Sequence, residues 1–87
     1  MNEKFFDLKS EKQDRIINAS LHVFSVNGFK HASTDTIVSE AGISKGLLFH
    51  YFISKQGLYE FLMDYCVRYM LFEIGRTVGN EERYFEF

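Results

Sequence analysis

The segment from Ser33 to Lys55 constrains the fold most, because it contains two helix-start signals separated by one helix-stop signal. Ser33 and Thr34 carry hydroxyls that accept hydrogen bonds from the unpaired amides at a helix start. Gly42 is the residue type best suited to the left-handed backbone that ends a helix. The segment therefore predicts a helix of about two turns, a tight turn and a second short helix.

The second short helix is predicted to begin after Ser44, which is another N-cap residue. Leu48 and Phe52 lie four residues apart and are expected to face the core. Solvent or a ligand then faces the other side, which carries Lys45, Gly46, Phe49 and His50. Gly46 weakens a helix but permits the close backbone approach that a DNA groove requires. This helix-turn-helix pattern makes DNA binding the first hypothesis.

Charge is distributed unevenly along the chain. The formal net charge is -2, whereas DNA-binding domains are usually basic. Residues 1–55 carry seven Lys and Arg against six Asp and Glu, and residues 56–87 carry three against six. Lys30, Lys45 and Lys55 are expected near the phosphate-facing side, and Lys55 opens the next helix, where unpaired amides add to its charge. We therefore expect weak non-specific DNA affinity with a shallow salt dependence.

The last predicted helix, Leu58 to Ile74, is apolar on nearly every side. Its polar positions form one line, Glu60, Asp64 and Arg68, which also interrupts any membrane span. One apolar stripe is expected to pack on the preceding helices: Leu58, Phe61, Leu62, Tyr65 and Tyr69. An opposite set also needs cover: Tyr59, Met63, Val67, Met70, Leu71 and Ile74. Because helices apolar all round are normally buried, we predict pairing with a second copy or a partner chain.

The two ends of the chain give weaker signals. A first helix is predicted over about Ser10 to Val26, from apolar residues at helical spacing. Before it, Phe5 and its neighbours either dock on the domain or form a loose N-terminal arm, and both alternatives stay open. The tail from Gly75 to Phe87 is assigned to neither helix nor loop.

Taken together, these motifs resemble the DNA-binding domain of the TetR/AcrR transcriptional regulators. The matching residues are Asn27-Gly28-Phe29, Ser33-Thr34, the turn motif Ile37 to Gly46, the aromatic run Leu48 to Phe52, and Lys55. The resemblance covers roughly residues 10 to 65 and implies an all-α fold. That fold is a homeodomain-like three-helix bundle with a helix-turn-helix, followed by a longer fourth helix.

The resemblance also implies a division of the chain. Residues 1–9 are an N-terminal arm, residues 10–56 are the DNA-binding domain, and residues 57–87 are a linking helix and tail. The 87 residues, 46% of them hydrophobic, suit one small domain. Family members are normally more than twice as long, so the C-terminal ligand-binding domain is expected to be absent or truncated.

The family pattern implies a role for each matching position. Positions aligned with Lys45, Gly46, Leu47 and His50 face the major groove, and those aligned with Thr34, Tyr51 and Lys55 commonly touch phosphates. Phe49 lies at the groove edge, where tyrosine is usual. The predicted DNA-binding residues are Ser33, Thr34, Ser44, Lys45, Gly46, Leu47, Phe49, His50, Tyr51 and Lys55.

Two positions depart from the family pattern. Leu47 replaces a common Thr or Ser, which changes a polar contact into an apolar one with a thymine methyl group. Ile53 stands where a basic or small residue is common, so one phosphate contact is lost.

The leading function is therefore a sequence-specific transcriptional regulator, usually a repressor in this family. It is expected to bind double-stranded DNA at a palindromic operator as a homodimer through the last helix, with recognition helices roughly 34 Å apart. The alternative is a protein-interaction module that pairs with a full-length relative and modulates it. A small-molecule effector is expected only if the native product has a C-terminal domain.

Other functional classes lack supporting motifs. The sequence has no glycine-rich phosphate loop, nucleophile elbow or metal motif, so no catalytic residue, metal site or cofactor is predicted. Cys66 is expected to be a buried packing residue, and a single cysteine suits a reducing cytoplasm. His22 is expected to be a surface or packing residue rather than a ligand, and His31 is expected to be solvated. We predict a cytoplasmic protein, because neither a signal peptide nor a membrane span is present.

Overall fold

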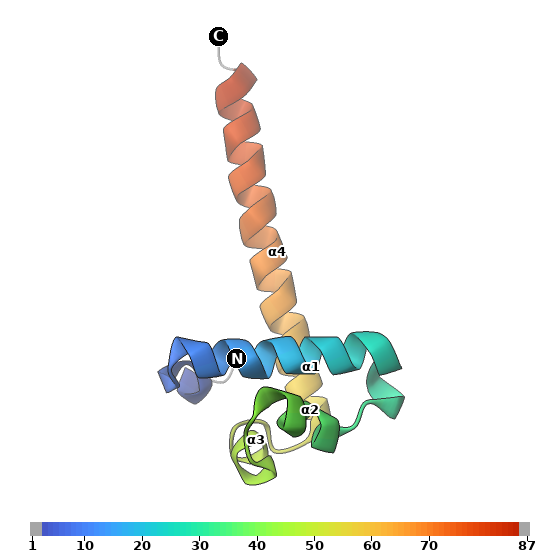
Figure 1. Cartoon of the computed structure of the whole chain (residues 1–87). Helices are drawn as coiled ribbons and strands as arrows, with labels where there is room; N and C mark the ends of the chain where they lie inside the picture. The colour runs from blue at the N-terminus through green and yellow to red at the C-terminus, as the bar shows by residue number, and fades with distance from the viewer. Residues whose placement is uncertain (1–2, 86–87) are drawn as a thin grey trace.

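The computed structural model describes the backbone of residues 3–85 and the side chains of residues 4–76. Every regular element in this part of the chain is a helix (Figure 1). In order, they are the 3₁₀ helix η1 (Glu3–Asp7) and the α-helices α1 (Ser10–His31), α2 (Thr34–Ala41), α3 (Lys45–Phe52) and α4 (Lys55–Phe85). The predicted all-α class, with a longer fourth helix after the three-helix bundle, is confirmed.

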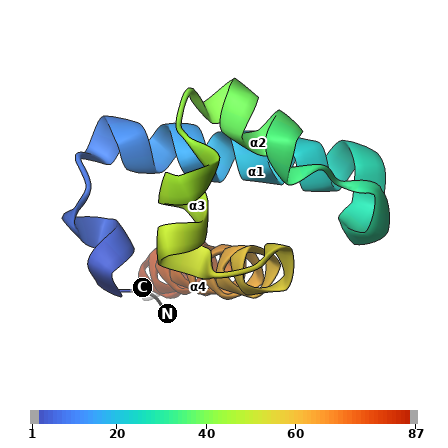
Figure 2. The same ribbon diagram turned by 90° about the horizontal axis from the view of Figure 1, so that it is seen from below.

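The helices form a small bundle with one projecting element. α1 and α3 pack against the first turns of α4, α2 packs on α1 and α3, and the rest of α4 extends away from them (Figure 1). The view along α4 shows α2 lying against α1, and α3 lying beside the start of α4 (Figure 2). The helix-turn-helix thus lies at the end of the molecule opposite the projecting part of α4.

α1 is longer than the sequence predicts because it continues past a kink. Gly28 has a φ of 75° and a ψ of 167°, which interrupts the helix and which a side-chain-bearing residue rarely adopts. One further turn reaches His31, and the amide of Ala32 donates to the Gly28 carbonyl at 3.0 Å. This kinked turn carries the chain from α1 to the start of α2.

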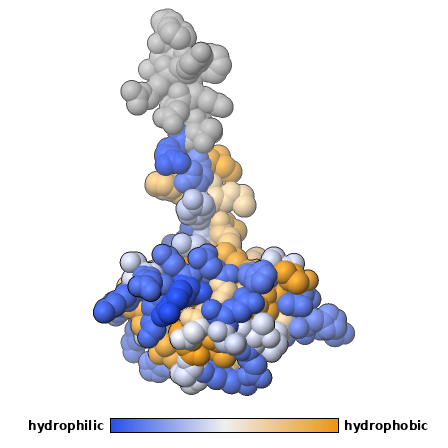
Figure 3. Space-filling view, in the orientation of Figure 1, coloured by the Kyte–Doolittle hydropathy of each residue, from blue (hydrophilic) through white to orange (hydrophobic). Residues whose placement is uncertain are grey.

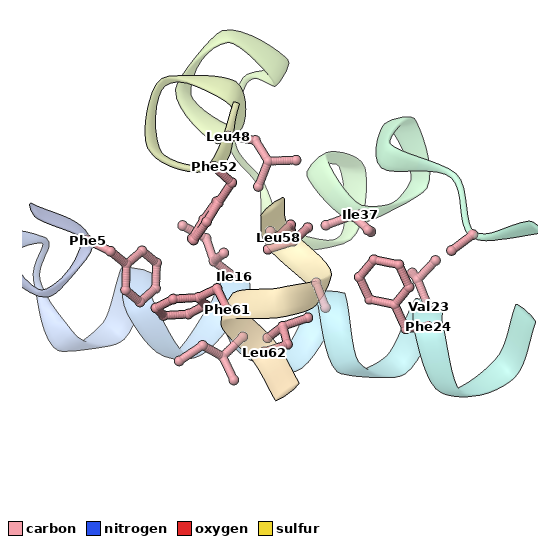
Figure 4. Packing of buried hydrophobic residues seen from close by; sticks show 14 residues of the cluster. Phe5, Ile16, Val23, Phe24, Ile37, Leu48, Phe52, Leu58, Phe61 and Leu62 are labelled. Carbon is pink, nitrogen blue, oxygen red and sulfur yellow. The ribbon is translucent and has the colours of Figure 1, made fainter. Parts of the chain in front are cut away.

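The core is one hydrophobic cluster to which every helix contributes (Figure 4). Its members are Phe5, Ile16, Ile17, Ala19, Val23, Phe24, Ala32, Ile37, Ala41, Leu48, Phe52, Leu58, Phe61 and Leu62. The four aromatic members have large apolar surfaces, so they account for much of the buried area. This cluster fixes the position of α3, because two α3 side chains belong to it.

Phe5 decides between the two alternatives for the N-terminal segment. Its side chain is fully buried, and its ring lies 5.5 Å from the Phe52 ring and 5.1 Å from the Phe61 ring, centroid to centroid. η1 therefore docks on the bundle and joins α3 to α4 from one side. The segment before α1 is part of the core rather than a loose arm.

Two predictions for α4 are wrong in detail. Leu58, Phe61 and Leu62 are buried as expected, and Tyr65 packs partly on the core, but Tyr69 is 60% exposed. Tyr69 lies one helical turn past Tyr65, where α4 has already left the bundle.

Tyr59 was expected to need cover from another chain, yet its own domain covers it. The Tyr59 ring lies 5.3 Å from the Phe24 ring and 5.0 Å from the Phe29 ring. The apolar pattern alone did not predict this contact, because the kinked end of α1 brings Phe29 to that side of α4.

The far part of α4 resolves the question left open for the tail. The backbone is helical through Phe85, so residues 75–85 continue the helix, and residues 86–87 lie outside the described residues. The polar line is solvated as predicted, with Arg68 Nε 3.2 Å from the Asp64 carboxylate. Within the described part of the chain, no helix is long and apolar enough to cross a membrane.

Candidate nucleic-acid interface

The two short helices begin and end where the sequence predicts. The Ser33 hydroxyl accepts a hydrogen bond from the Thr36 amide at 3.4 Å, and the Ser44 hydroxyl accepts one from the Leu47 amide at 3.0 Å. Gly42 ends α2 with a φ of 69° and a ψ of 36°, the left-handed conformation of a C-terminal glycine. These caps fix α3 at a defined angle to α2.

Packing of α3 determines which of its residues face outward. Leu48 and Phe52 are buried, as predicted, so the helix cannot rotate without exposing them. Lys45, Gly46 and His50 are exposed, and the half-buried positions are Leu47 and Phe49. The outward side of α3 thus carries three of the four residues that the sequence assigns to the major groove, and the fourth, Leu47, is half-buried.

The residues assigned to phosphate contacts flank α3. Thr34, at the first turn of α2, is half-buried, and Ser33 before it is exposed. Tyr51 is half-buried on α3, with its ring 6.2 Å from Phe5 and 5.1 Å from His50 in edge-to-face contacts. Tyr51 therefore connects the core to the outward side of α3.

Lys55 has a structural role that the sequence did not indicate. Its ammonium donates to the carbonyl of Phe29 at 2.8 Å and to those of Lys30 and Ala32 at 3.3 Å each. The ammonium also lies 4.7 Å from the centroid of the Phe29 ring. Because an ammonium has three N–H donors, these bonds use its full capacity. Phosphate contact by Lys55 stays a prediction.

A tight turn fixes α3 against α4. The Ser54 amide donates to the Phe52 carbonyl at 2.7 Å, and Ile53 between them has a φ of 69° and a ψ of -44°, which resembles a strained γ-turn. The Ser54 hydroxyl then caps α4 by accepting from the Gly57 amide at 3.0 Å. A Cβ at Gly57 would overlap the Phe52 carbonyl oxygen, so glycine permits this close approach.

One ion pair joins α2 to α3 on the outward side. Lys45 Nζ lies 2.9 Å from Asp35 Oδ1, and both side chains are more than half exposed. Asp35 lies in the first turn of α2, and sequence reasoning did not predict this pair. The partners are ten residues apart on different helices, so only the angle between α2 and α3 reveals the contact.

His22 and His31 lie at the surface, which for His22 was one of two alternatives, whereas Cys66 differs from its prediction. His22 Nδ1 lies 3.0 Å from Glu40 Oε2 and ties α1 to α2, and His31 is exposed. Cys66 is half-buried rather than buried, because it lines an open hollow between α1 and α4. No three His, Cys, Asp or Glu side chains among the described residues are grouped so that they could hold a metal ion.

Comparisons with known proteins agree with this geometry. The family model described as "Bacterial regulatory proteins, tetR family" matches residues 16–62, which include every candidate DNA-binding residue. The uncharacterized HTH-type transcriptional regulator YerO of Bacillus subtilis (strain 168) is 36% identical over 73 residues, covering 84% of this chain and 24% of that protein.

Two other relatives are also similar to this chain. The HTH-type transcriptional regulator UidR of Escherichia coli (strain K12) is 50% identical over 44 residues, covering 51% of this chain and 22% of that protein. The HTH-type transcriptional regulator BetI of Proteus mirabilis (strain HI4320) is 34% identical over 76 residues, covering 87% of this chain and 36% of that protein. This chain thus spans 22% to 36% of the length of these three relatives. No solved structure matches it.

Proposed function

This chain belongs to the tetR family of bacterial regulatory proteins, and on that premise we propose that it binds a specific operator with α3 as its recognition helix. The family consists of transcription regulators rather than enzymes. More specifically, we propose that the chain is a repressor that binds a palindromic operator as a dimer. Its site of action is then the bacterial cytoplasm, where the chromosome lies.

The outward side of α3 is the observation that carries this proposal. Lys45, Gly46 and His50 are exposed there, while Leu48 and Phe52 anchor the opposite side in the core. An α-helix held in this way fits the width of the major groove. Ser33 and Ser44 are exposed at the N-termini of α2 and α3, and the N-terminus of a helix suits phosphate oxygens.

A dimer follows from the symmetry of a palindrome. Two recognition helices must then lie about one turn of DNA apart, roughly 34 Å, or a multiple of that distance. The projecting part of α4 supports this proposal, since several large apolar side chains there are exposed. A small-molecule effector belongs to this proposal only for a product with further C-terminal sequence.

DNA selection from a library of randomised duplexes tests the operator proposal. We expect the purified chain at low salt to enrich an inverted repeat, and Lys45→Gln to reduce that enrichment by at least about fivefold, since a charged contact to a base or phosphate is worth about 1–3 kcal/mol. Lys45 suits this test better than Lys55, whose ammonium is bonded within the fold.

Arg68→Gln is the matched control for the selection. It removes the same charge from α4 instead of α3, at a side chain whose Nε lies 3.2 Å from the Asp64 carboxylate. The control should enrich the same repeat as the unmodified chain. If a folded chain enriches no sequence, or if the two variants lose enrichment equally, operator reading by α3 is wrong.

A second candidate function rests on the same apolar part of α4. In this alternative, the chain is a protein-interaction module that pairs with a full-length relative and modulates it. The observation that favours it is the exposed set Val67, Met70, Leu71, Phe72 and Ile74. Lys45→Gln separates the two functions, because it should leave partner binding unchanged in the second and reduce operator enrichment in the first.

A further inference from the structure

Lys45 is the only lysine or arginine on α3, and its ammonium is already next to an anion. Asp35 Oδ1 lies 2.9 Å from Lys45 Nζ, and the side chains are 75% and 54% exposed, respectively. A DNA phosphate that approaches α3 would therefore meet a cation whose charge is largely offset. The pair is exposed, so it is weak enough for a well-placed competitor to break it.

The other nearby lysines do not replace Lys45. The Lys55 ammonium is bonded to three carbonyl oxygens of the α1–α2 junction. Lys30 is exposed on the kinked turn of α1, outside the helix-turn-helix itself. The Lys45 ammonium is therefore the main positive charge on the proposed recognition helix, and a group that pairs with it weakens the attraction of this helix for DNA.

We propose that Asp35 is a specificity-determining residue, which lowers binding to DNA in general by competing with phosphates for the Lys45 ammonium. This inference rests on the proposed function and explains how the chain distinguishes an operator from random DNA. At an operator, the other contacts of α3 hold the DNA in place, so that Lys45 exchanges Asp35 for the DNA. On random DNA those contacts are missing, and the carboxylate also repels phosphates within a Debye length of about 8–10 Å.

Asp35→Asn tests the proposal with a probe that needs no known operator. Fluorescence anisotropy would measure the binding of the full chain to a labelled duplex of randomised sequence between about 50 and about 200 mM NaCl. We expect Asp35→Asn to bind about two- to fivefold more tightly at low salt, as release of an exposed ion pair allows. Its log–log salt slope should become steeper by up to about 0.9, the value for one additional neutralised phosphate.

Two comparisons show whether the effect acts through Lys45. Glu40→Gln removes the same charge from the other end of α2, where the carboxylate pairs with His22 instead, and it should leave the salt slope unchanged. In a Lys45→Gln background, Asp35→Asn should give no further gain in affinity. Once an operator has been selected, the ratio of operator to random affinity should fall in Asp35→Asn.

The outcomes separate this inference from the proposed function. Unchanged or weaker random-DNA binding by folded Asp35→Asn would overturn it, since Asp35 would then be positioning Lys45 or only stabilising the first turn of α2. An equal gain in random-DNA affinity in Glu40→Gln, or in Asp35→Asn made in the Lys45→Gln background, would show that only net charge matters. That result would also overturn the inference. If the folded unmodified chain bound neither random nor selected DNA, the proposed function itself would fail.

Discussion

Gly46 is a residue whose identity the fold alone does not require. A Cβ added there would meet only the Ser44 hydroxyl oxygen, at 4.0 Å, which is ordinary contact. Glycine inside a helix costs roughly 0.5–1 kcal/mol relative to alanine. We therefore predict that Gly46→Ala raises the free energy of unfolding by about 0.5 kcal/mol and nevertheless weakens DNA binding. Urea unfolding and anisotropy with the selected operator measure the two effects separately.

Gly75 provides the control for this prediction. It also lies within a helix, and a Cβ there would meet nothing within 4 Å. Gly75→Ala should stabilise the helix in the same way but leave DNA affinity unchanged, because it is on the projecting part of α4. Operator binding by Gly46→Ala at the unmodified affinity would show that no DNA surface approaches the α3 backbone closely.

Local rules explain which site residues were predictable from sequence. Ser33, Gly42 and Ser44 were assigned correctly as helix caps, because a cap interacts with amides or carbonyls within a few residues of itself. The partners of Lys55 were not predictable, since its acceptors lie 23 to 26 residues earlier in the chain. Docking of Phe5 also stayed open, because a short segment has no periodicity from which to infer a buried side.

At the scale of elements, the start of α4 holds the end of α1. The last carbonyls of a helix have no partner within it, and a cation there is favourable. Lys55 supplies such a cation to the kinked turn that precedes α2. We predict that Lys55→Met, which keeps the aliphatic stem, lowers the free energy of unfolding by about 1–2 kcal/mol. Urea unfolding followed by circular dichroism measures this loss.

Lys30→Met is the matched variant, because Lys30 is an exposed lysine on the same turn. Its effect on the free energy of unfolding should stay within about 0.5 kcal/mol. Equal losses in the two variants would mean that the carbonyl contacts of Lys55 contribute nothing beyond charge. A loss of DNA binding in Lys55→Met is informative about phosphates only at temperatures where the variant is fully folded.

The apolar pattern of α4 predicted the helix but not the point where it leaves the bundle. Leu58 and Leu62 were assigned correctly, because they lie one turn apart on the side that meets α1 and α3. The errors at Tyr59 and Tyr69 have one cause, which is that periodicity carries no information about where other helices end. Phe29, which follows the kink at Gly28, covers Tyr59, and α4 projects past the bundle before Tyr69.

At the scale of the whole molecule, the projecting part of α4 is the largest departure from a closed fold. Figure 3 shows hydrophobic residues along this part of the helix, next to hydrophilic ones. Those that are at least half exposed are Val67, Tyr69, Met70, Leu71, Phe72 and Ile74. Beside them, the hollow between α1 and α4 is lined by apolar side chains including Ile17, Leu21 and Met70. Monomeric proteins rarely expose so many large apolar side chains together.

We predict that these side chains pair two copies of the chain, and that a charged residue among them separates the copies. Sedimentation velocity at micromolar concentration should show a dimer for the unmodified chain and a monomer for Leu71→Glu, because burying an unpaired carboxylate costs several kcal/mol. Leu71 lies outside the core cluster, so the variant should keep its helical content. Arg68→Gln, on the polar line of the same helix, should remain dimeric. A stable monomer for the unmodified chain would contradict dimerisation through α4 and would require another route to a two-fold complex on a palindrome.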